Sequence, residues 1–338
     1  MLTLHDPLHR RQFLRVGGLS LGGLTLADAF ALKSFAKTQK LPLRDKSVIF
    51  LFQHGGPSQF ETFDPKMDAP REIRSATGEI PTRIPGVTFG STFERLAKLN
   101  DKFSIVRSFH TGDANHDIKP VVGRDTLRAN MGTLYARVAG ALRPDSAMPT
   151  NVALFPRAVD TATGPAITQF GNFEATGEFG SAYAPFVPGA GGGLQADMKL
   201  NLPQARLNDR RELLASLDQW KRQVEAGDAF GGFDTFQQQA FSALERGMSD
   251  AFDLAQEDPR LLARYDTAPL LPKDKISPAW KNREHYADNA ATLGKLLLLA
   301  RRLCERGAGF VTVTTSFVWD MHADVNNAPM TTGMDYVG

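Results

Sequence analysis

The chain has 338 residues, a net charge of +2 and a single cysteine. Apolar residues make up 42% of it and charged residues 22%, which is typical of a globular protein and excludes a disordered or fibrous chain. The small net charge gives no reason to expect nucleic acid or a membrane surface as a partner, and one cysteine excludes an internal disulfide. Beyond the N-terminal region, no apolar run reaches the roughly 20 residues that a transmembrane helix needs.

Residues 1–31 have the pattern of a bacterial twin-arginine signal peptide. Arg10 and Arg11 precede a short apolar run rich in Gly and Leu, and Ala29 and Ala31 form an A-x-A cleavage site. An amphipathic helix with a chance arginine pair is the alternative, but the order of charge, apolar run and cleavage site favours export. We therefore expect the twin-arginine export machinery as a partner, a periplasmic or secreted location, and a mature protein without a transmembrane segment.

The next segments predict the start of an α/β domain. Residues 32–46 are polar and lysine-rich and predict a linker. The continuous apolar run 47–52 is typical of a strand buried on both faces, as in a parallel sheet under helices. A short helix over 92–99 and a second strand over 103–108 would complete a first βαβ-type unit.

The rest of the chain predicts further strands and helices in alternation. A helix over 133–143 and a strand over 151–155 come first, and residues 204–265 have the composition of a helical insertion that covers one side of the sheet. Apolar residues at three-and-four spacing predict a long helix over 282–306, followed by a buried strand over 310–318. The fold class is therefore α/β, with a mainly parallel sheet flanked by helices.

Three histidines follow predicted strands. His54, His110 and His322 lie at or just after strand ends, where open α/β sheets bind their ligands. His54 is suited to bind a metal through a neutral imidazole or to hydrogen-bond an anion. A tight turn with a hydrogen-bonded histidine is the alternative there. His285 begins a helix and is expected to be structural or on the surface.

The loop that begins at His110 is rich in metal-binding residue types. His110 and His116, with Asp113 and Asp117, place two imidazoles and two carboxylates within eight residues, enough to bind a divalent cation. A loop dense in Asp, Asn and Gly is also how turns are built, so both interpretations stay open.

Asp320 and His322 follow the most convincing strand of the chain. Because alternate side chains of an extended segment point to the same side, this carboxylate and imidazole are suited to coordinate one metal together.

These segments resemble the domain-of-unknown-function 1501 family, secreted bacterial proteins related to sulfatases within the alkaline phosphatase-like superfamily. The resemblance is carried by the leader, by 54–66, by 103–108, by the Asp113-x-Asn115-His116 loop and by 319–322. These segments span nearly the whole chain in the expected order.

The resemblance implies an alkaline phosphatase-like domain over 47–338, in which metals at the carboxyl edge of a mixed sheet activate a nucleophile that attacks phosphate or sulfate esters. It implies metal roles for Asp320 and His322, and it places His54 near the position where relatives have an aspartate ligand. The resemblance also places the 110–116 loop near the position of the nucleophile in the relatives, and Thr111 is the residue of that loop with a hydroxyl group. Family members continue beyond residue 338, which implies that the domain is incomplete at its C-terminus.

We therefore expect an exported hydrolase of sulfate or phosphate esters that depends on a divalent metal, whether Zn, Ca, Mg or Mn. A non-catalytic envelope protein that binds a carbohydrate or a sulfated polymer is the alternative, and a third interpretation leaves the histidines a purely structural role. The residues assigned to the site are the catalytic Thr111 and His116 and the metal ligands His54, Asp113, Asp320 and His322.

Overall fold

The computed structural model describes residues 46–110, 112, 115, 116, 118, 122, 123, 126–144, 146–168, 170–189, 206, 209 and 249–338. The strands are β1 (Val48–Phe52), β2 (Glu79–Pro81), β3 (Thr88–Gly90), β4 (Asn151–Leu154) and β5 (Phe310–Thr314). The α-helices are α3 (Glu94–Ala97), α4 (Met131–Ala139), α8 (Ser249–Phe252), α9 (Pro259–Arg264), α10 (Arg283–Glu305) and α11 (Met330–Val337).

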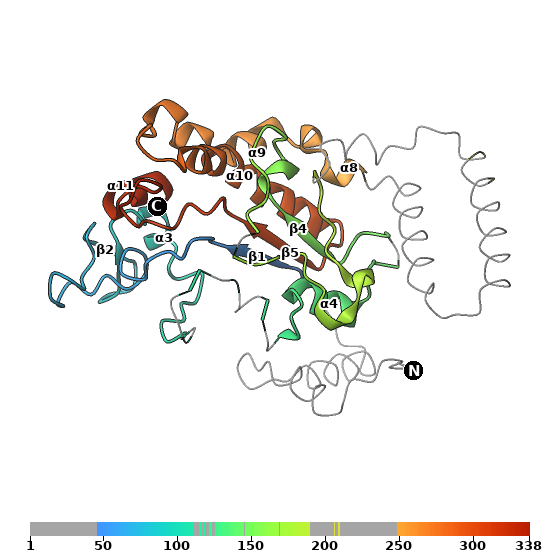
Figure 1. Cartoon of the computed structure of the whole chain (residues 1–338), viewed down its shortest axis with the longest axis horizontal. Coiled ribbons are helices and arrows are strands. Elements are labelled where there is room, and N and C mark those ends of the chain that lie inside the picture. Colours follow the sequence, from blue (N-terminus) through green and yellow to red (C-terminus); the bar gives the residue numbers. More distant parts are fainter. Residues whose placement is uncertain are drawn as a thin grey trace.

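A parallel three-stranded sheet forms the centre of the fold. Its strand order is β1-β5-β4, so the last strand in the sequence lies between the other two. Phe310 is in register with both Val48 of β1 and Asn151 of β4. The carboxyl ends of all three strands therefore meet at one edge, from which the chain runs on toward β2 after β1 and toward α11 after β5 (Figure 1).

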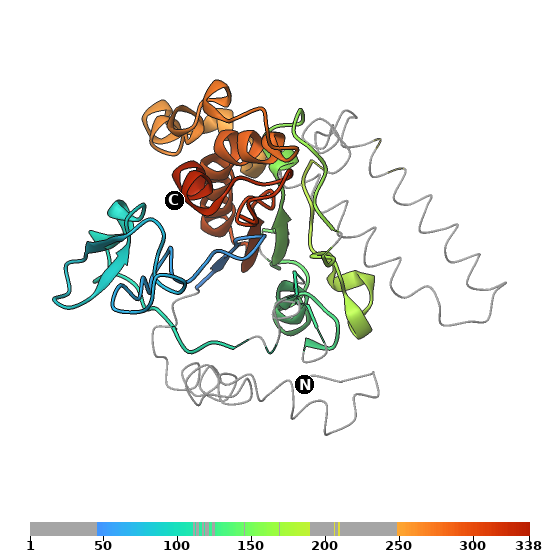
Figure 2. The same ribbon diagram turned by 60° about the vertical axis from the view of Figure 1, so that its left-hand side comes forward.

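Helices cover both faces of this sheet (Figure 2). One face packs against α10, in a core that contains Val152, Leu154, Val311 and Val313 with Leu296, Leu299 and Leu303. The other face carries Ala153, Phe50 and Phe52, which pack in a separate cluster with Met131 of α4. The prediction of an α/β fold with a parallel sheet flanked by helices is confirmed by this arrangement.

The strand predictions are confirmed unevenly. β4 and β5 are buried along their whole length, but β5 ends at Thr314 and not at Val318, the end predicted for it. β1 has the expected bounds but is an edge strand, and 41% of Ile49 is exposed, so the prediction that it is buried on both faces is wrong.

The predicted strand over 103–108 is absent. This segment has no strand partner, Val106 is 74% exposed, and Ile105 packs on a core cluster from outside the sheet. The βαβ unit predicted from it does not form, because β1 pairs instead with β5.

Most of the remaining predicted elements are present. The helix over 282–306 is α10, and the helices over 92–99 and 133–143 correspond to the shorter α3 and α4. The signal peptide, nearly all of the linker, and residues 204–248 of the helical insertion except 206 and 209 lie outside the described residues. The rest of the insertion forms α8 and α9, and α8 packs against α10 through Phe252. In the described part of the chain, no helix has both the length and the apolar character to span a membrane.

Candidate metal centre

Three side chains from two distant segments converge beyond the carboxyl edge of the sheet. Asp320 and His322 follow β5, and His116 comes from the chain between α3 and α4. Asp320 Oδ1 lies 2.5 Å from His322 Nε2 and 3.6 Å from His116 Nε2, and the two Nε2 atoms are 3.0 Å apart. Metal ions are bound mainly by His, Cys, Asp and Glu. Within the described ranges, this is the one group of three or more of these residues whose ligand atoms all lie within 4.8 Å of one another. We call these three residues the triad.

The chain that follows β1 is held close to the chain that follows β5. The His54 N–H donates to Thr315 Oγ1 over 2.9 Å, and the Trp319 N–H donates to the His54 carbonyl over 3.3 Å. Gly55 has φ of 110°, and a Cβ atom there would lie 2.5 Å from the backbone nitrogen of Asp320. Glycine is therefore needed for the chain to pass so close to Asp320.

A second core fixes the segment that carries Asp320. Val318 and Trp319 are buried with Phe93, which precedes α3, and with Met334 of α11. The Phe93 and Trp319 rings meet edge to face, with centroids 6.5 Å apart. This packing holds the backbone on the N-terminal side of Asp320, so the carboxylate is presented by a rigid segment.

The three triad side chains differ in their exposure to solvent. The Asp320 side chain is 9% exposed, whereas those of His116 and His322 are 35% and 53% exposed. Burial raises the pKa of the Asp320 carboxyl, and the two neighbouring histidines oppose that rise. Its second oxygen accepts a hydrogen bond of 3.4 Å from Asn327 Nδ2. The carboxylate thus forms the base of the site and the imidazoles form its solvent side.

The triad has the chemistry and the dimensions of a metal centre. Two imidazoles and a carboxylate, with room for solvent, are a frequent ligand set of catalytic zinc sites. Ligand atoms about 2.1 Å from a tetrahedral ion lie roughly 3.4 Å from one another. The three separations in the triad, 2.5, 3.0 and 3.6 Å, lie around that value, so small side-chain movements would accommodate an ion.

His54 lies apart from the triad in a different environment. Its side chain is buried, and its Nε2 atom has no hydrogen-bond partner among the described residues. Burial, reinforced by repulsion from His116, lowers the pKa of His54 to about 4, so its imidazole is neutral at pH 7. It does not belong to the group of ligand atoms within 4.8 Å of one another.

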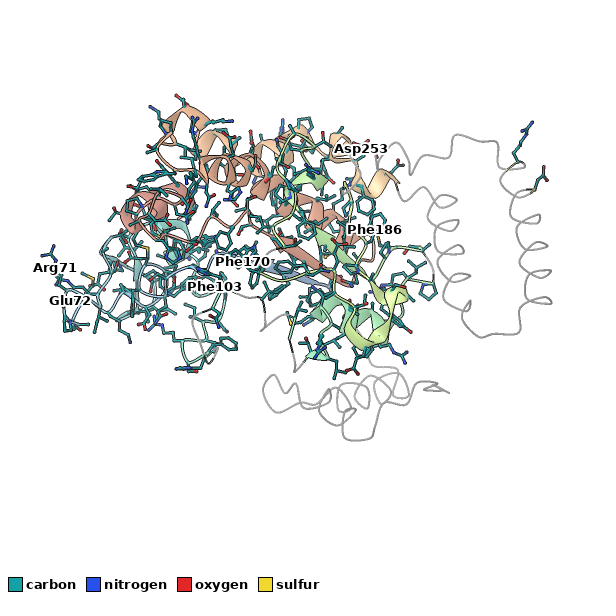
Figure 3. All side chains as sticks on the ribbon, viewed as in Figure 1. Arg71, Glu72, Phe103, Phe170, Phe186 and Asp253 are labelled. Atoms are coloured by element: carbon teal, nitrogen blue, oxygen red, sulfur yellow. The ribbon has the colours of Figure 1, made fainter. Side chains whose placement is uncertain are left out.

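Two stacked phenylalanines connect His54 with the triad. The rings of Phe170 and Phe317 stack with centroids 4.6 Å apart, and both rings meet His54 and His116 edge to face. Phe170 lies beside the end of β1 (Figure 3). Phe317 has φ of 56°, a conformation uncommon for a bulky residue, which takes the chain out of the line of β5. Sequence reasoning missed this pair, and nothing local to Phe170 marks it.

The predicted site residues have separate outcomes. Asp320 and His322 point to the same side, as their spacing predicts, and His116 joins them. The catalytic role predicted for His116 stays a prediction. Thr111 and Asp113 lie outside the described residues, and His110 is exposed and follows a segment that is not a strand.

Comparison with known families identifies the chain over most of its length. The family described as "Protein of unknown function (DUF1501)" matches residues 45–334, so the chain belongs to the domain-of-unknown-function 1501 family. No curated protein and no solved structure matches it. The match includes the central sheet, α10 and all three residues of the triad.

Proposed function

We propose that this member of the domain-of-unknown-function 1501 family is an exported, metal-dependent hydrolase of sulfate or phosphate esters, with an alkaline phosphatase-like fold. The observation that carries the proposal is the triad, in which two imidazoles and one carboxylate converge at the carboxyl edge of a parallel sheet. Imidazole ligands favour zinc over calcium or magnesium, whose preferred ligands are oxygens.

Each residue of the triad has a role that follows from its surroundings. His116, Asp320 and His322 would hold the ion, and we assign His116 to this role because its Nε2 lies 3.0 Å from that of His322. The bound metal would act as a Lewis acid toward the ester oxygens. The buried Asp320 would orient the two imidazoles, whose exposed sides leave room for an anionic substrate.

The loop before His116 would supply the remaining chemistry. Thr111 is proposed as the hydroxyl nucleophile and Asp113 as a further ligand, both on the resemblance of this loop to the nucleophile region of sulfatase relatives. Export through the twin-arginine route supports a metal loaded before secretion, and it rests on the pattern of residues 1–31.

The proposal is tested by metal content measured together with ester hydrolysis. We expect elemental mass spectrometry of the purified wild-type protein to show about one metal per chain, and hydrolysis of p-nitrophenyl sulfate or p-nitrophenyl phosphate that stops on chelation and returns with zinc. Asp320→Asn and His322→Ala are expected to abolish both metal retention and hydrolysis, because each removes one of three ligands.

His110→Ala is the matched control, since it removes an exposed histidine six residues before His116 that lies outside the triad. It should retain metal and activity. A folded wild-type protein that binds no added zinc would contradict the proposal, as would metal retention unchanged in Asp320→Asn.

A further inference from the structure

A cavity of about 400 Å³ lies at the carboxyl ends of all three parallel strands, separate from the triad. His54 follows β1, Phe155 follows β4, and Thr315 follows β5. The first turns of α10 close the cavity with His285 and Asp288, and the loop 164–168 forms another wall. This volume lies within the range of roughly 300–1,000 Å³ that is usual for small-molecule sites.

Two histidines on the cavity wall have unpaired nitrogens. His54 is only 3% exposed, and neither its Nε2 nor the Nδ1 of His285 has a hydrogen-bond partner among the described residues. Leaving a buried polar atom unpaired costs about 1–3 kcal/mol. His285 was expected to be structural or on the surface, but it faces the same cavity as His54. Both side chains line the cavity, so its wall has polar groups beside its apolar surface.

The charged side chains on the cavity wall do not favour an anion. None of the described residues that line it is Lys or Arg, and the one charged group on its wall is the carboxylate of Asp288. Burial lowers the pKa of both His54 and His285, so neither imidazole brings a positive charge at pH 7. Burial raises the pKa of Asp288, and the hydrogen bond from the Gly164 N–H and the nearby His285 oppose that rise. The surroundings are therefore neutral to negative.

The remaining wall combines hydroxyls with apolar surface. Thr314, Thr315 and Ser316 follow one another along the end of β5, and Phe155 and Phe317 contribute aromatic rings. Hydroxyls both donate and accept hydrogen bonds, and an unpaired imidazole nitrogen does one or the other according to its tautomer. A ligand rich in hydroxyls can pair with either tautomer and also donate to the carboxylate.

We propose that this cavity binds a neutral, hydroxyl-rich ligand of about the size of a monosaccharide. The polar edges of such a ligand would pair with His54, His285 and Asp288, and its apolar face would lie on an aromatic ring. This site goes beyond the proposed hydrolase, because none of its contacts uses the residues of the triad.

The test is saturation-transfer-difference NMR on the full chain after treatment with a chelator, with D-glucose, D-galactose and myo-inositol as probes. We expect at least one of the three to give a saturable signal without metal. His285→Phe, which removes one polar partner and fills space, should weaken binding at least tenfold. Ala166→Leu, which narrows the cavity from the 164–168 loop, should do the same if His285→Phe fails to fold.

Two controls separate this proposal from the hydrolase. His110→Ala and Asp320→Asn should bind the sugar like the wild type, because neither residue lines the cavity, whereas Asp320→Asn abolishes metal retention. Inorganic sulfate serves as an anionic probe of the same cavity and ethanolamine as a cationic one. The proposal is overturned if none of the three polyols binds, if binding is unchanged in both cavity variants, or if sulfate or ethanolamine binds at the cavity in their place.

Discussion

His54 and His116 contact the same two phenylalanine rings but lie in opposite environments. Both meet Phe170 and Phe317 edge to face. His116 is partly exposed and lies 3.6 Å from a carboxylate oxygen, whereas His54 is buried with an unpaired Nε2. Position at the carboxyl edge of the sheet therefore does not define the role of a histidine. A neighbouring carboxylate makes one a candidate ligand, and burial makes the other a neutral wall of a cavity.

We expect the largest effect in metal content, which should differ between variants of His116 and His54. His116→Ala should lose the metal, because it removes one ligand of the triad, while His54→Leu should retain about one ion per chain. Elemental mass spectrometry of both variants measures the difference. Loss of metal from His54→Leu would restore the role predicted from the sequence and end the distinction between the two sites.

Substitutions at two adjacent glycines test whether the close approach of the backbone after β1 to Asp320 matters for stability. Gly55→Ala should destabilise the protein by about 3 kcal/mol, because its φ of 110° disfavours a side chain and its Cβ would meet the Asp320 nitrogen at 2.5 Å. Gly56→Ala is the control, since φ is 80° there but nothing lies within 4 Å, and it should cost about 1 kcal/mol. Urea unfolding measures both, and equal losses would show that the close approach to Asp320 is unimportant.

Acid should destabilise the metal-free protein through His54. In the unfolded chain, the His54 imidazole has a pKa of about 6.5 and takes up a proton below that pH. In the folded chain its pKa is about 4, so it takes up the proton only near pH 4. Stability is therefore full above pH 6.5 and falls as the pH drops toward 4, by roughly 2–3 kcal/mol. His54→Leu should remove this part of the acid sensitivity in urea unfolding measured from pH 7 to pH 4. The exposed His110→Leu should leave it in place, and the same acid profile in His54→Leu would refute the assignment.

The smallest expected effect concerns the stacked ring that both histidines contact. Phe170→Leu removes the aromatic stack with Phe317 and should cost about 1 kcal/mol, with metal retained. Phe109→Leu, at a ring that is 67% exposed, should cost nearly nothing. Thermal unfolding and metal content compare the two variants. Loss of metal from Phe170→Leu would mean that the ring positions His116.

The elements predicted most closely are α10 and β5, which have clear local patterns. A three-and-four apolar spacing predicts the helix, and a run of aromatic and β-branched residues predicts the strand, because both patterns are properties of neighbouring residues. The pairing of Asp320 with His322 was predictable for the same reason, since alternation along an extended segment has a period of two.

Non-local contacts account for the predictions that failed. The segment 103–108 has the residues of a strand, but no partner strand lies beside it, and β1 lies at the sheet edge because β5 inserted between β1 and β4. A sequence pattern records the preference of a segment for extended backbone, but it does not record which neighbour is available for pairing.

The sequence predicted the family and the α/β class, and it indicated that His54 and the Asp320–His322 pair follow strands at one edge of the sheet. The folded structure is needed to see that His116 joins Asp320 and His322, and that His54 lies on the wall of a cavity with His285. The physical reason is the length of chain between the partners. His116 and His322 are 206 residues apart and the His54–Thr315 hydrogen bond spans 261, so burial and proximity at this edge arise only when the whole sheet is assembled.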